Sequence, residues 1–197
     1  MMGASVMPQV LDVLRQEHTN IATLLRTLEW QVTEFESGNQ PDYDVIGATL
    51  DYFLSFPDVY HHPKEELLFS KLRDRDPGAA NRIGDLRIAH QELAARARKF
   101  ATALRAVLAE AEMPREALIR WSRGFIDLQR QHIDMEESTF FPTAEKALTA
   151  KDWTDLTALI KREDDPLFDE EVDQRFEQLR KTILCWQAED QAVSAKQ

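Results

Sequence analysis

The sequence predicts an all-α protein, namely an up-down-up-down four-helix bundle over residues 1–148 followed by a C-terminal helical appendage over residues 149–197. Two observations predict this fold class. Apolar residues recur at alternating spacings of three and four along four long segments, which is the repeat of an amphipathic helix. Short turns separate these segments, and the chain has only 6 glycines among many helix-favouring leucines, alanines and glutamates. Long helices joined by short turns pack as an antiparallel bundle.

The first predicted helix covers residues 8–36, and residues 37–41 end it with glycine, asparagine and proline. Its apolar face comprises Leu11, Leu14, Ile21, Leu25, Leu28, Val32 and Phe35. The second predicted helix runs from about residue 42 to about residue 75. Pro57 and Pro63 should kink it, because each proline removes an intrahelical hydrogen bond.

The third predicted helix follows a turn at residues 76–78 and repeats the pattern of the first. Its apolar face comprises Ile83, Leu86, Leu93, Ala97, Phe100, Leu104 and Val107. Residues 113–114 end it and open the fourth predicted helix, which continues to about residue 147. The fourth apolar face comprises Leu118, Trp121, Phe125 and Leu128.

Two shorter helices are predicted in the appendage. Thr149 and Asp152 fit a capping box with aspartate in place of glutamate, which opens a helix ending near residue 163. After a turn at residues 164–166, Asp169 is expected to cap a last helix that reaches to about residue 190. The apolar residues of both helices should lie against the bundle or against a partner, which could be a second copy in a homodimer: Trp153, Leu156, Phe176, Leu179, Ile183 and Trp186.

Composition and charge argue against several classes of partner. The chain has 24 basic and 35 acidic residues, a net charge of −11, so we expect neither nucleic acid nor an anionic membrane surface as a partner. We also expect no secretory signal and no membrane span, because no segment of about 18 apolar residues occurs. Cys185 is the only cysteine, so no internal disulfide can form. A cytoplasmic location is the expectation that follows.

One histidine interrupts the apolar stripe of the first helix, and another interrupts that of the third. His18 and His90 occupy the same place in their stripes, 72 residues apart. A single histidine on an apolar face is more often a hydrogen-bonded core residue than a metal ligand. Here, however, the segments that begin at His61 and His132 also align, with a shift of 71 residues. The bundle is therefore predicted to be a duplicated helix pair in which each half contains His … His-x-x-x-Glu.

The His-x-x-x-Glu spacing places chemically active side chains together. Residues at i and i+4 of a helix point the same way, so His61 lies with Glu65 and His132 with Glu136. Both pairs fall on the apolar stripe, which predicts that the imidazoles and carboxylates converge on the bundle axis. A buried carboxylate is stable only when it is paired or bound to metal. We therefore expect two divalent or trivalent metal ions bridged by Glu65 and Glu136, with the histidines as terminal ligands.

Four segments resemble the hemerythrin family, and specifically the bacterial hemerythrin-like proteins with an HHE cation-binding domain. These segments are QEHTNI, HHPKEELLF, RIAHQELA and HIDMEESTFFP, and the resemblance covers roughly residues 8–148. It implies a four-helix bundle with a non-haem di-iron site, in which carboxylates bridge two iron ions and oxygen binds at one of them. The matching positions are the terminal ligands His18, His61, His90 and His132 and the bridging carboxylates Glu65 and Glu136.

One position departs from the family pattern. The invertebrate oxygen carriers have a further histidine one turn after the third-helix ligand, where this chain has Ala94. Some relatives instead use the residue directly after the second-helix histidine, which here is His62. Adjacent helix residues point about 100° apart, so His61 and His62 could both bind only if they serve different metals or if Pro63 distorts the turn. His62 is therefore either a further ligand or a hydrogen-bonding neighbour of the metals.

Three hypotheses about function follow. The first is a protein that binds or senses oxygen or a related small diatomic molecule, since imidazole suits iron. The second is a di-iron oxidase or peroxidase, or a protein that handles nitric oxide or iron. Ferritin-like oxidases, however, use Glu-x-x-His with about four carboxylates, and this chain has the reverse order. The third, a metal-free interaction module, leaves Glu65 and Glu136 unexplained. We expect oxygen and metal binding rather than enzymatic turnover.

Overall fold

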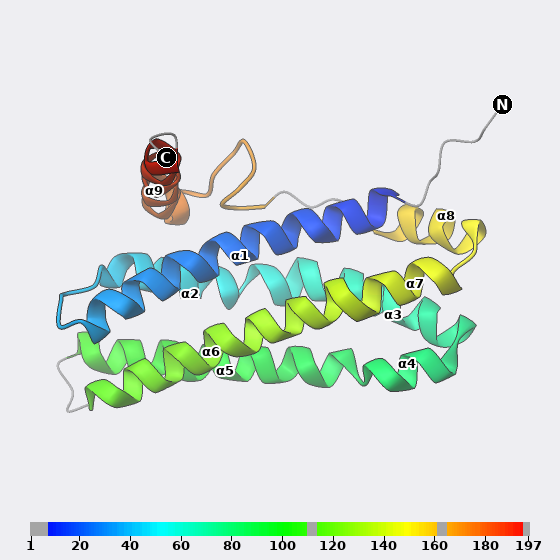
Figure 1. The fold of residues 1–197 in the computed structure, drawn as a ribbon, viewed down its shortest axis with the longest axis horizontal. Coiled ribbons are helices and arrows are strands. Elements are labelled where there is room, and N and C mark those ends of the chain that lie inside the picture. Colours follow the sequence, from blue (N-terminus) through cyan, green and yellow to red (C-terminus); the bar gives the residue numbers. More distant parts are fainter. Residues whose placement is uncertain (1–7, 110–113, 161–164, 195–197) are drawn as a thin grey trace.

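The structure is a computed structural model that describes residues 8–109, 114–160 and 165–194 (Figure 1). Within these ranges the chain forms helices and turns and no strand, which confirms the all-α prediction. No helix in the described part of the chain is long and apolar enough to cross a membrane.

The first helix, α1 (Pro8–Glu36), has the predicted bounds and runs along most of the molecule, up to α8 (Ala150–Leu159) (Figure 1). Its predicted apolar face is almost entirely buried. The turn that follows contains Gly38 at a φ of 91°, a left-handed conformation that residues with a side chain rarely adopt. Asp42 then caps α2 (Tyr43–Phe53), because its carboxylate accepts hydrogen bonds from two backbone N–H groups of the first turn.

The second predicted helix is interrupted close to its two prolines, as the sequence predicts. A π-helical turn, η1 (Pro57–His61), separates α2 from α3 (His62–Arg75). In this turn the N–H of His62 bonds to the carbonyl of Pro57, five residues back, and not to the residue four back. Pro63 follows in the first turn of α3, where a missing N–H leaves no helical hydrogen bond unmade.

A short helix, α4 (Pro77–Ile83), replaces the predicted turn before the third helix. Asp76 caps its start, and Gly84 ends it at a φ of 94°. Asp85 then caps α5 (Leu86–Leu108). The long third helix therefore begins at residue 86 rather than directly after the predicted turn at residues 76–78, because two capping aspartates and a left-handed glycine divide the segment.

The fourth predicted helix contains a second π-helical turn. α6 (Arg115–Met135) leads into η2 (Glu136–Phe140) and then into α7 (Phe141–Ala147), which ends where the sequence predicts. The first N–H of α7 bonds to the carbonyl of Glu136, five residues back. Pro142, which has no N–H, follows at once. Both π-helical turns thus include or adjoin predicted ligand residues, and such turns are frequent at functional sites.

The long helices lie side by side along the molecule, and the chain reverses direction between them (Figure 1). α1 packs beside α2 and α6, α5 packs beside α2 and α6, and α3 packs beside α5 and α7. The turn after α1 lies at one end of the molecule, whereas α4 lies at the other (Figure 1).

Two apolar clusters fill the interior of the described part of the chain. The first cluster joins α2 to parts of α1, α5 and α6 and includes Phe125. The second cluster joins α3, α7 and α8 to the start of α1 and includes Phe140. On α1, His18 falls between Leu14 of the second cluster and Ile21 of the first. The predicted ligand residues therefore occupy the gap between two apolar regions.

The helix α8 (Ala150–Leu159) begins with the predicted capping box, because Thr149 and Asp152 each accept a hydrogen bond from the backbone N–H of the other. It ends at Leu159 rather than near residue 163, and residues 161–164 lie outside the described ranges. Its large apolar side chains are fully buried in the second cluster: Trp153 and Leu156.

The last helix begins later than predicted, which is a further correction. Asp169 does not cap it, because the carboxylate of Asp169 accepts a hydrogen bond from the backbone N–H of Asp165. Asp173 instead caps a 3₁₀ turn, η3 (Gln174–Phe176), which leads into α9 (Glu177–Ser194). α9 contacts α2 and crosses the direction of the bundle, so that Figure 1 shows it nearly end-on.

The apolar side chains of α9 and of the turn before it pack on the bundle. Those that join the first cluster are Phe176, Leu179 and Ile183. The ring of Trp186 contacts that of Trp30, with centroids 4.6 Å apart. Both C-terminal helices therefore share the buried clusters of the bundle. The division at residue 148 and a homodimer through these helices stay predictions.

Candidate metal centre

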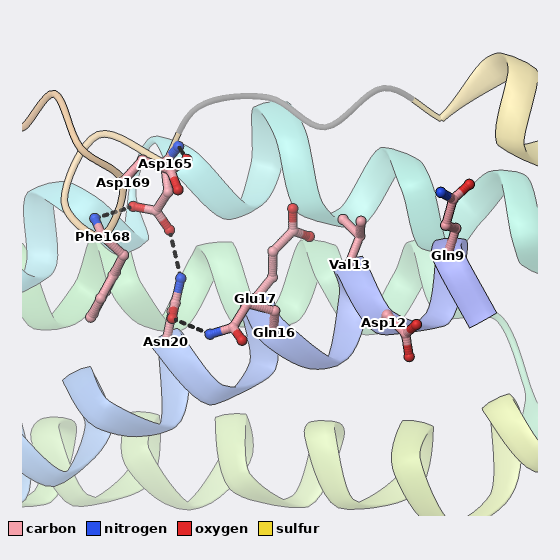
Figure 2. Close-up of a pocket in the computed structure, with 9 residues that line it drawn as sticks. All are labelled: Gln9, Asp12, Val13, Gln16, Glu17, Asn20, Asp165, Phe168 and Asp169. Atoms are coloured by element: carbon pink, nitrogen blue, oxygen red, sulfur yellow. Dashed lines mark hydrogen bonds between the residues drawn. The ribbon is translucent and has the colours of Figure 1, made fainter.

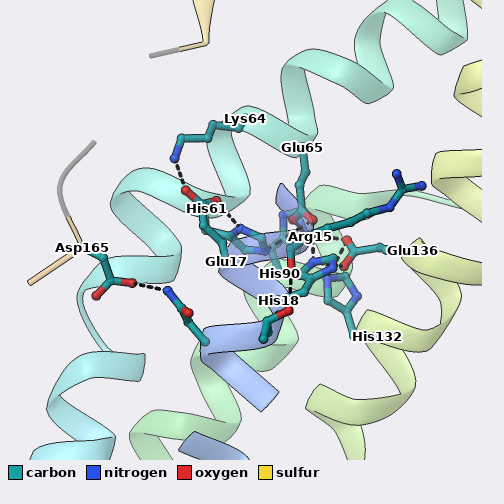
Figure 3. A network of polar contacts seen from close by, with 12 residues as sticks. Arg15, Glu17, His18, His61, Lys64, Glu65, His90, His132, Glu136 and Asp165 are labelled. Carbon is teal, nitrogen blue, oxygen red and sulfur yellow. Dashed lines mark hydrogen bonds and ion pairs between the residues drawn. The ribbon is translucent and has the colours of Figure 1, made fainter. Parts of the chain in front are cut away.

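The structure brings the predicted ligand residues together in the middle of the bundle (Figure 3). Each of them is at most 8% exposed: His18, His61, His62, Glu65, His90, His132 and Glu136. Within the described residues, ligand atoms no more than 4.8 Å apart define a first group and a second group. The first group is His18, His61 and Glu65, and the second group is His62, Glu65, His90 and His132. Glu65 belongs to both.

The carboxylate of Glu65 lies between imidazoles from three elements. Its Oε1 is 3.2 Å from Nε2 of His18 and 3.3 Å from Nε2 of His61. Its Oε2 is 3.4 Å from Nε2 of His90. One oxygen therefore faces the first group and the other faces the second.

The carboxylate of Glu136 also lies between histidines of the two groups, although Glu136 belongs to neither group. Its Oε1 is 3.0 Å from Nε2 of His132 and 3.7 Å from Nε2 of His90. Its Oε2 is 3.3 Å from Nε2 of His18. Both carboxylates predicted to bridge thus have one oxygen toward each set of histidines.

The π-helical turn η1 explains how two adjacent histidines are both buried. A regular helix would turn consecutive side chains about 100° apart. The extra residue in the η1 turn changes this register just before α3, and His61 and His62 are 2% and 5% exposed. His61 joins the first group and His62 joins the second. The distortion lies before Pro63, as the sequence allowed.

Several buried atoms at this centre have no hydrogen-bond partner among the described residues. They are Glu65 Oε2, both carboxylate oxygens of Glu136, both ring nitrogens of His90, and Nε2 of His132. Unpartnered buried polar atoms cost about 1–3 kcal/mol each, more when charged. These nitrogen and oxygen atoms lie close together without hydrogen-bond geometry between them. Imidazole nitrogens and carboxylate oxygens are metal ligands, so the donor set fits a cation.

Electrostatics explain how the carboxylates stay ionised. Burial and the charge of Glu65 would raise the pKa of Glu136, but close contacts with three histidines, chiefly His132, hold it at about 2. Burial would also raise the pKa of Glu65, but the nearby histidines, chiefly His61, keep it well below its usual range. Two ionised carboxylates at such close quarters require positive charge around them.

In the metal-free protein, protons on the histidines supply that charge. Burial would lower the pKa of His18, but three glutamates in close contact with the ring, chiefly Glu136, raise it to about 11. Burial would likewise lower the pKa of His90, but the carboxylates of Glu136 and Glu65 close to its Nε2 raise it to about 9. Metal ions bind deprotonated ligands, so a bound cation takes the place of these protons.

A second layer of carboxylates contacts the outer nitrogen of several imidazoles. Nδ1 of His18 lies 2.7 Å from Glu137 Oε1, and Nδ1 of His61 lies 2.9 Å from Glu17 Oε2. Carboxylates at this nitrogen orient a ligating imidazole and fix its tautomer.

The two remaining outer carboxylates lie beside the second group. Nδ1 of His62 lies 3.1 Å from Asp58 Oδ1, whereas Glu66 Oε1 is 3.6 Å from Nδ1 of His90, too far for a hydrogen bond. Sequence reasoning did not identify Glu17 or Asp58. Asp58 is one helical turn before His62 and could have been found by spacing. Glu17 could not, because its partner lies on another element.

Ala94 and His62 are the two positions at which the sequence departs from the pattern of the oxygen carriers. Ala94 is buried one turn after His90 and offers no ligand atom. The imidazole of His62 instead stacks on that of His90, with centroids 3.9 Å apart. The second group therefore has a third imidazole, from His62 of α3, where Ala94 of α5 provides none.

An all-α protein with buried histidines and glutamates gathered in this way is a cation-binding protein. The family model of the hemerythrin HHE cation-binding domain matches residues 9–144 of the sequence, and the chain belongs to this family. Comparison with curated proteins and with solved structures gives no significant match.

Proposed function

We propose that the protein is a non-haem di-iron protein that binds or senses oxygen or a related small diatomic molecule. The observation that carries this proposal is the position of Glu65, whose oxygens face histidines of both groups. A carboxylate placed there can bridge two cations, which would remove the cost of burying its charge. The proposed architecture is an up-and-down four-helix bundle over residues 1–148 with a C-terminal helical extension over residues 149–197.

The two groups would each hold one iron ion. His18 and His61 would bind the first, and His62, His90 and His132 the second, with Glu65 and Glu136 as bridges. Imidazole nitrogen and carboxylate oxygen both suit iron. When bound, iron supplies the reversible coordination of a diatomic ligand, which no side chain provides. The role of the chain is to hold the imidazoles in place and to keep the site dry.

His62 is proposed as a ligand rather than as a neighbour of the metals. Its ring nitrogen lies with those of His90 and His132 and with a Glu65 oxygen inside one group. Without it, the second iron would have two imidazoles. Asp58 supports this role, because its hydrogen bond occupies Nδ1 and leaves Nε2 for the metal.

Binding is favoured over oxidase or peroxidase chemistry by the donor set. Five histidines and two carboxylates surround the centre, whereas ferritin-like oxidases use about four carboxylates. The single cysteine, Cys185, is consistent with a reducing compartment, and the cytoplasm is the location we propose.

Metal analysis combined with visible spectroscopy tests this function. Protein produced in iron-rich medium should contain about two iron ions per chain. After anaerobic reduction, oxygen should change the visible spectrum, and degassing should reverse at least part of the change. Continuous turnover of an added reductant would show an oxidase or peroxidase instead. Less than one metal ion per chain would contradict the di-metal site.

A further inference from the structure

A buried ion pair lies directly behind His61, and the proposed function makes no use of it. Glu17 on α1 and Lys64 on α3 are 6% and 5% exposed. The ammonium of Lys64 donates a hydrogen bond to Oε1 of Glu17, and Nδ1 of His61 lies 2.9 Å from Oε2 (Figure 3). Lysine and glutamate are rarely buried this deeply unless they are paired. Among the described residues, the hydrogen-bond partners found for the carboxylate of Glu17 are Lys64 and His61.

The position of Glu17 follows from the turn of α1. His18 faces the centre of the bundle, and the preceding residue points about 100° away from it, toward α3. On that side Glu17 also lines a surface cavity of about 590 Å³ between α1 and the segment at residues 165–169 (Figure 2). Glu17 thus stands between the cavity and His61.

The pair determines which nitrogen of His61 carries the proton. An ionised carboxylate accepts only, so its partner at 2.9 Å must be an N–H at Nδ1. In the neutral ring the other nitrogen, Nε2, then has a free lone pair. Nε2 of His61 is the atom that faces Glu65, 3.3 Å from its Oε1. A ring without the Glu17 contact could instead donate from Nε2 to Glu65, which would block metal binding.

The role of Lys64 follows from the cost of isolated buried charge. A buried carboxylate with no counter-charge is strongly disfavoured. The ammonium of Lys64 supplies this counter-charge at Oε1 of Glu17, while Oε2 of the same carboxylate contacts Nδ1 of His61. A neutral side chain of the same shape at position 17, such as glutamine, would still accept the hydrogen bond from His61. It would not need the counter-charge of Lys64.

We propose that Glu17 and Lys64 are a positioning pair that holds His61 as the Nδ1–H tautomer, with Nε2 turned toward the metal of the first group. The metal itself rests on the proposed function, but the tautomer is a property of the metal-free chain. Two measurements can therefore be made on the same variants, one without metal and one with it.

Two double variants separate an orienting role from a structural ion pair. Glu17→Gln with Lys64→Met removes both charges but keeps an oxygen acceptor for His61. Glu17→Leu with Lys64→Met removes the charges and the acceptor at similar volume. Asp12→Asn is the control for charge alone, because Asp12 is exposed and lines the same cavity, and no hydrogen bond or ion pair joins it to a histidine among the described residues.

The first measurement is long-range ¹H–¹⁵N NMR of the metal-free protein at alkaline pH. We call Glu17→Gln with Lys64→Met the Gln/Met variant and Glu17→Leu with Lys64→Met the Leu/Met variant. His61 should be the Nδ1–H tautomer in the parent, in the Gln/Met variant and in Asp12→Asn. In the Leu/Met variant His61 should lose this preference. Retention of the Nδ1–H tautomer in the Leu/Met variant would overturn the proposal.

The second measurement is Co²⁺ titration followed by visible absorption. The Leu/Met variant should bind one Co²⁺ like the parent and the other about 10–100-fold more weakly, as is usual when an outer partner of a ligating histidine is lost. The Gln/Met variant and Asp12→Asn should stay within about threefold of the parent. Equal affinities in both double variants would overturn the orienting role. Failure of the parent to bind Co²⁺, with the NMR result intact, would contradict the metal site and leave the orientation of His61 supported.

Discussion

The imidazole of His62 lies parallel to that of His90, at a centroid distance of 3.9 Å and an interplanar angle of 7°. The two rings come from α3 and α5, and their nitrogens belong to the same group of candidate ligands. This contact places a histidine from a different helix beside His90, one turn from Ala94. Substitution of His62 is therefore the most direct test of which histidines bind the metal of the second group.

The variants His62→Ala and His61→Ala should affect different metals. In His62→Ala the first group is intact, so one metal should bind as in the parent and the other at least about tenfold more weakly. His61→Ala should be more damaging, because His61 also contacts the Glu65 oxygen that faces the first group. Stepwise Fe²⁺ titration under anaerobic conditions measures both affinities.

The same titration can contradict the assignment of His61 and His62 to different metals. Equal loss of both metals in the two variants would show that the histidines are equivalent ligands. Parent-like affinities in His62→Ala would exclude His62 from the site and leave the second iron with two imidazoles.

Metal removal should lower the midpoint of thermal unfolding. Binding to the folded state alone stabilises it by about 2.7 kcal/mol when the free metal is at 100 times its Kd. Circular-dichroism melts with and without a chelator measure this. Glu65→Gln should abolish the metal-dependent rise, whereas Glu92→Gln, on the exposed side of α5, should keep it. An unfolding midpoint of the parent protein that is the same with and without metal would argue against a metal site in the core.

Acid should remove the contribution of Asp152 to stability. Hydrogen bonds from Arg75 and then from Thr149 hold the pKa of Asp152 well below its usual range. A carboxyl group with a depressed pKa in the folded state stabilises it above the unfolded pKa of about 3.9 and loses that effect as pH falls further. Asp152→Asn should therefore cost about 1–2 kcal/mol at neutral pH.

Urea unfolding from pH 7 downward checks this pH dependence. The difference between parent and Asp152→Asn should be constant above about pH 5 and shrink below about pH 4. Asp155→Asn is the matched control, because Asp155 is half-exposed and pairs with Lys151 on the surface. A difference that grew on acidification would contradict the assignment.

The segment that leads into α9 should contribute to the stability of the bundle. Phe176 is fully buried in the first cluster, so Phe176→Ala should cost about 3–5 kcal/mol. Leu184 on α9 is 53% exposed, and Leu184→Ala should stay within about 0.5 kcal/mol of the parent. Denaturant unfolding compares the two. Equal, small effects would indicate that residues 149–197 fold apart from the bundle.

The sequence alone predicted the all-α class and the positions that converge. The spacings of three and four determine which side chains share a helix face, and this face is buried whatever the neighbouring helix is. His18 and His90 could therefore be placed on the axis, as could the pairs that end in Glu65 and Glu136. Local chemistry also sufficed for the capping box at Thr149, whose partner lies three residues away.

Only the tertiary structure decided the features that depend on contacts between elements. Glu17 looks like a surface neighbour of His18 in the sequence, yet packing of α1 on α3 makes it the partner of His61 and Lys64. The π-helical turn before His62 depends on a choice between carbonyls four and five residues back. Such turns are rare in helices, so the spacing of residues alone does not predict one here, and it is this turn that brings both adjacent histidines into the core.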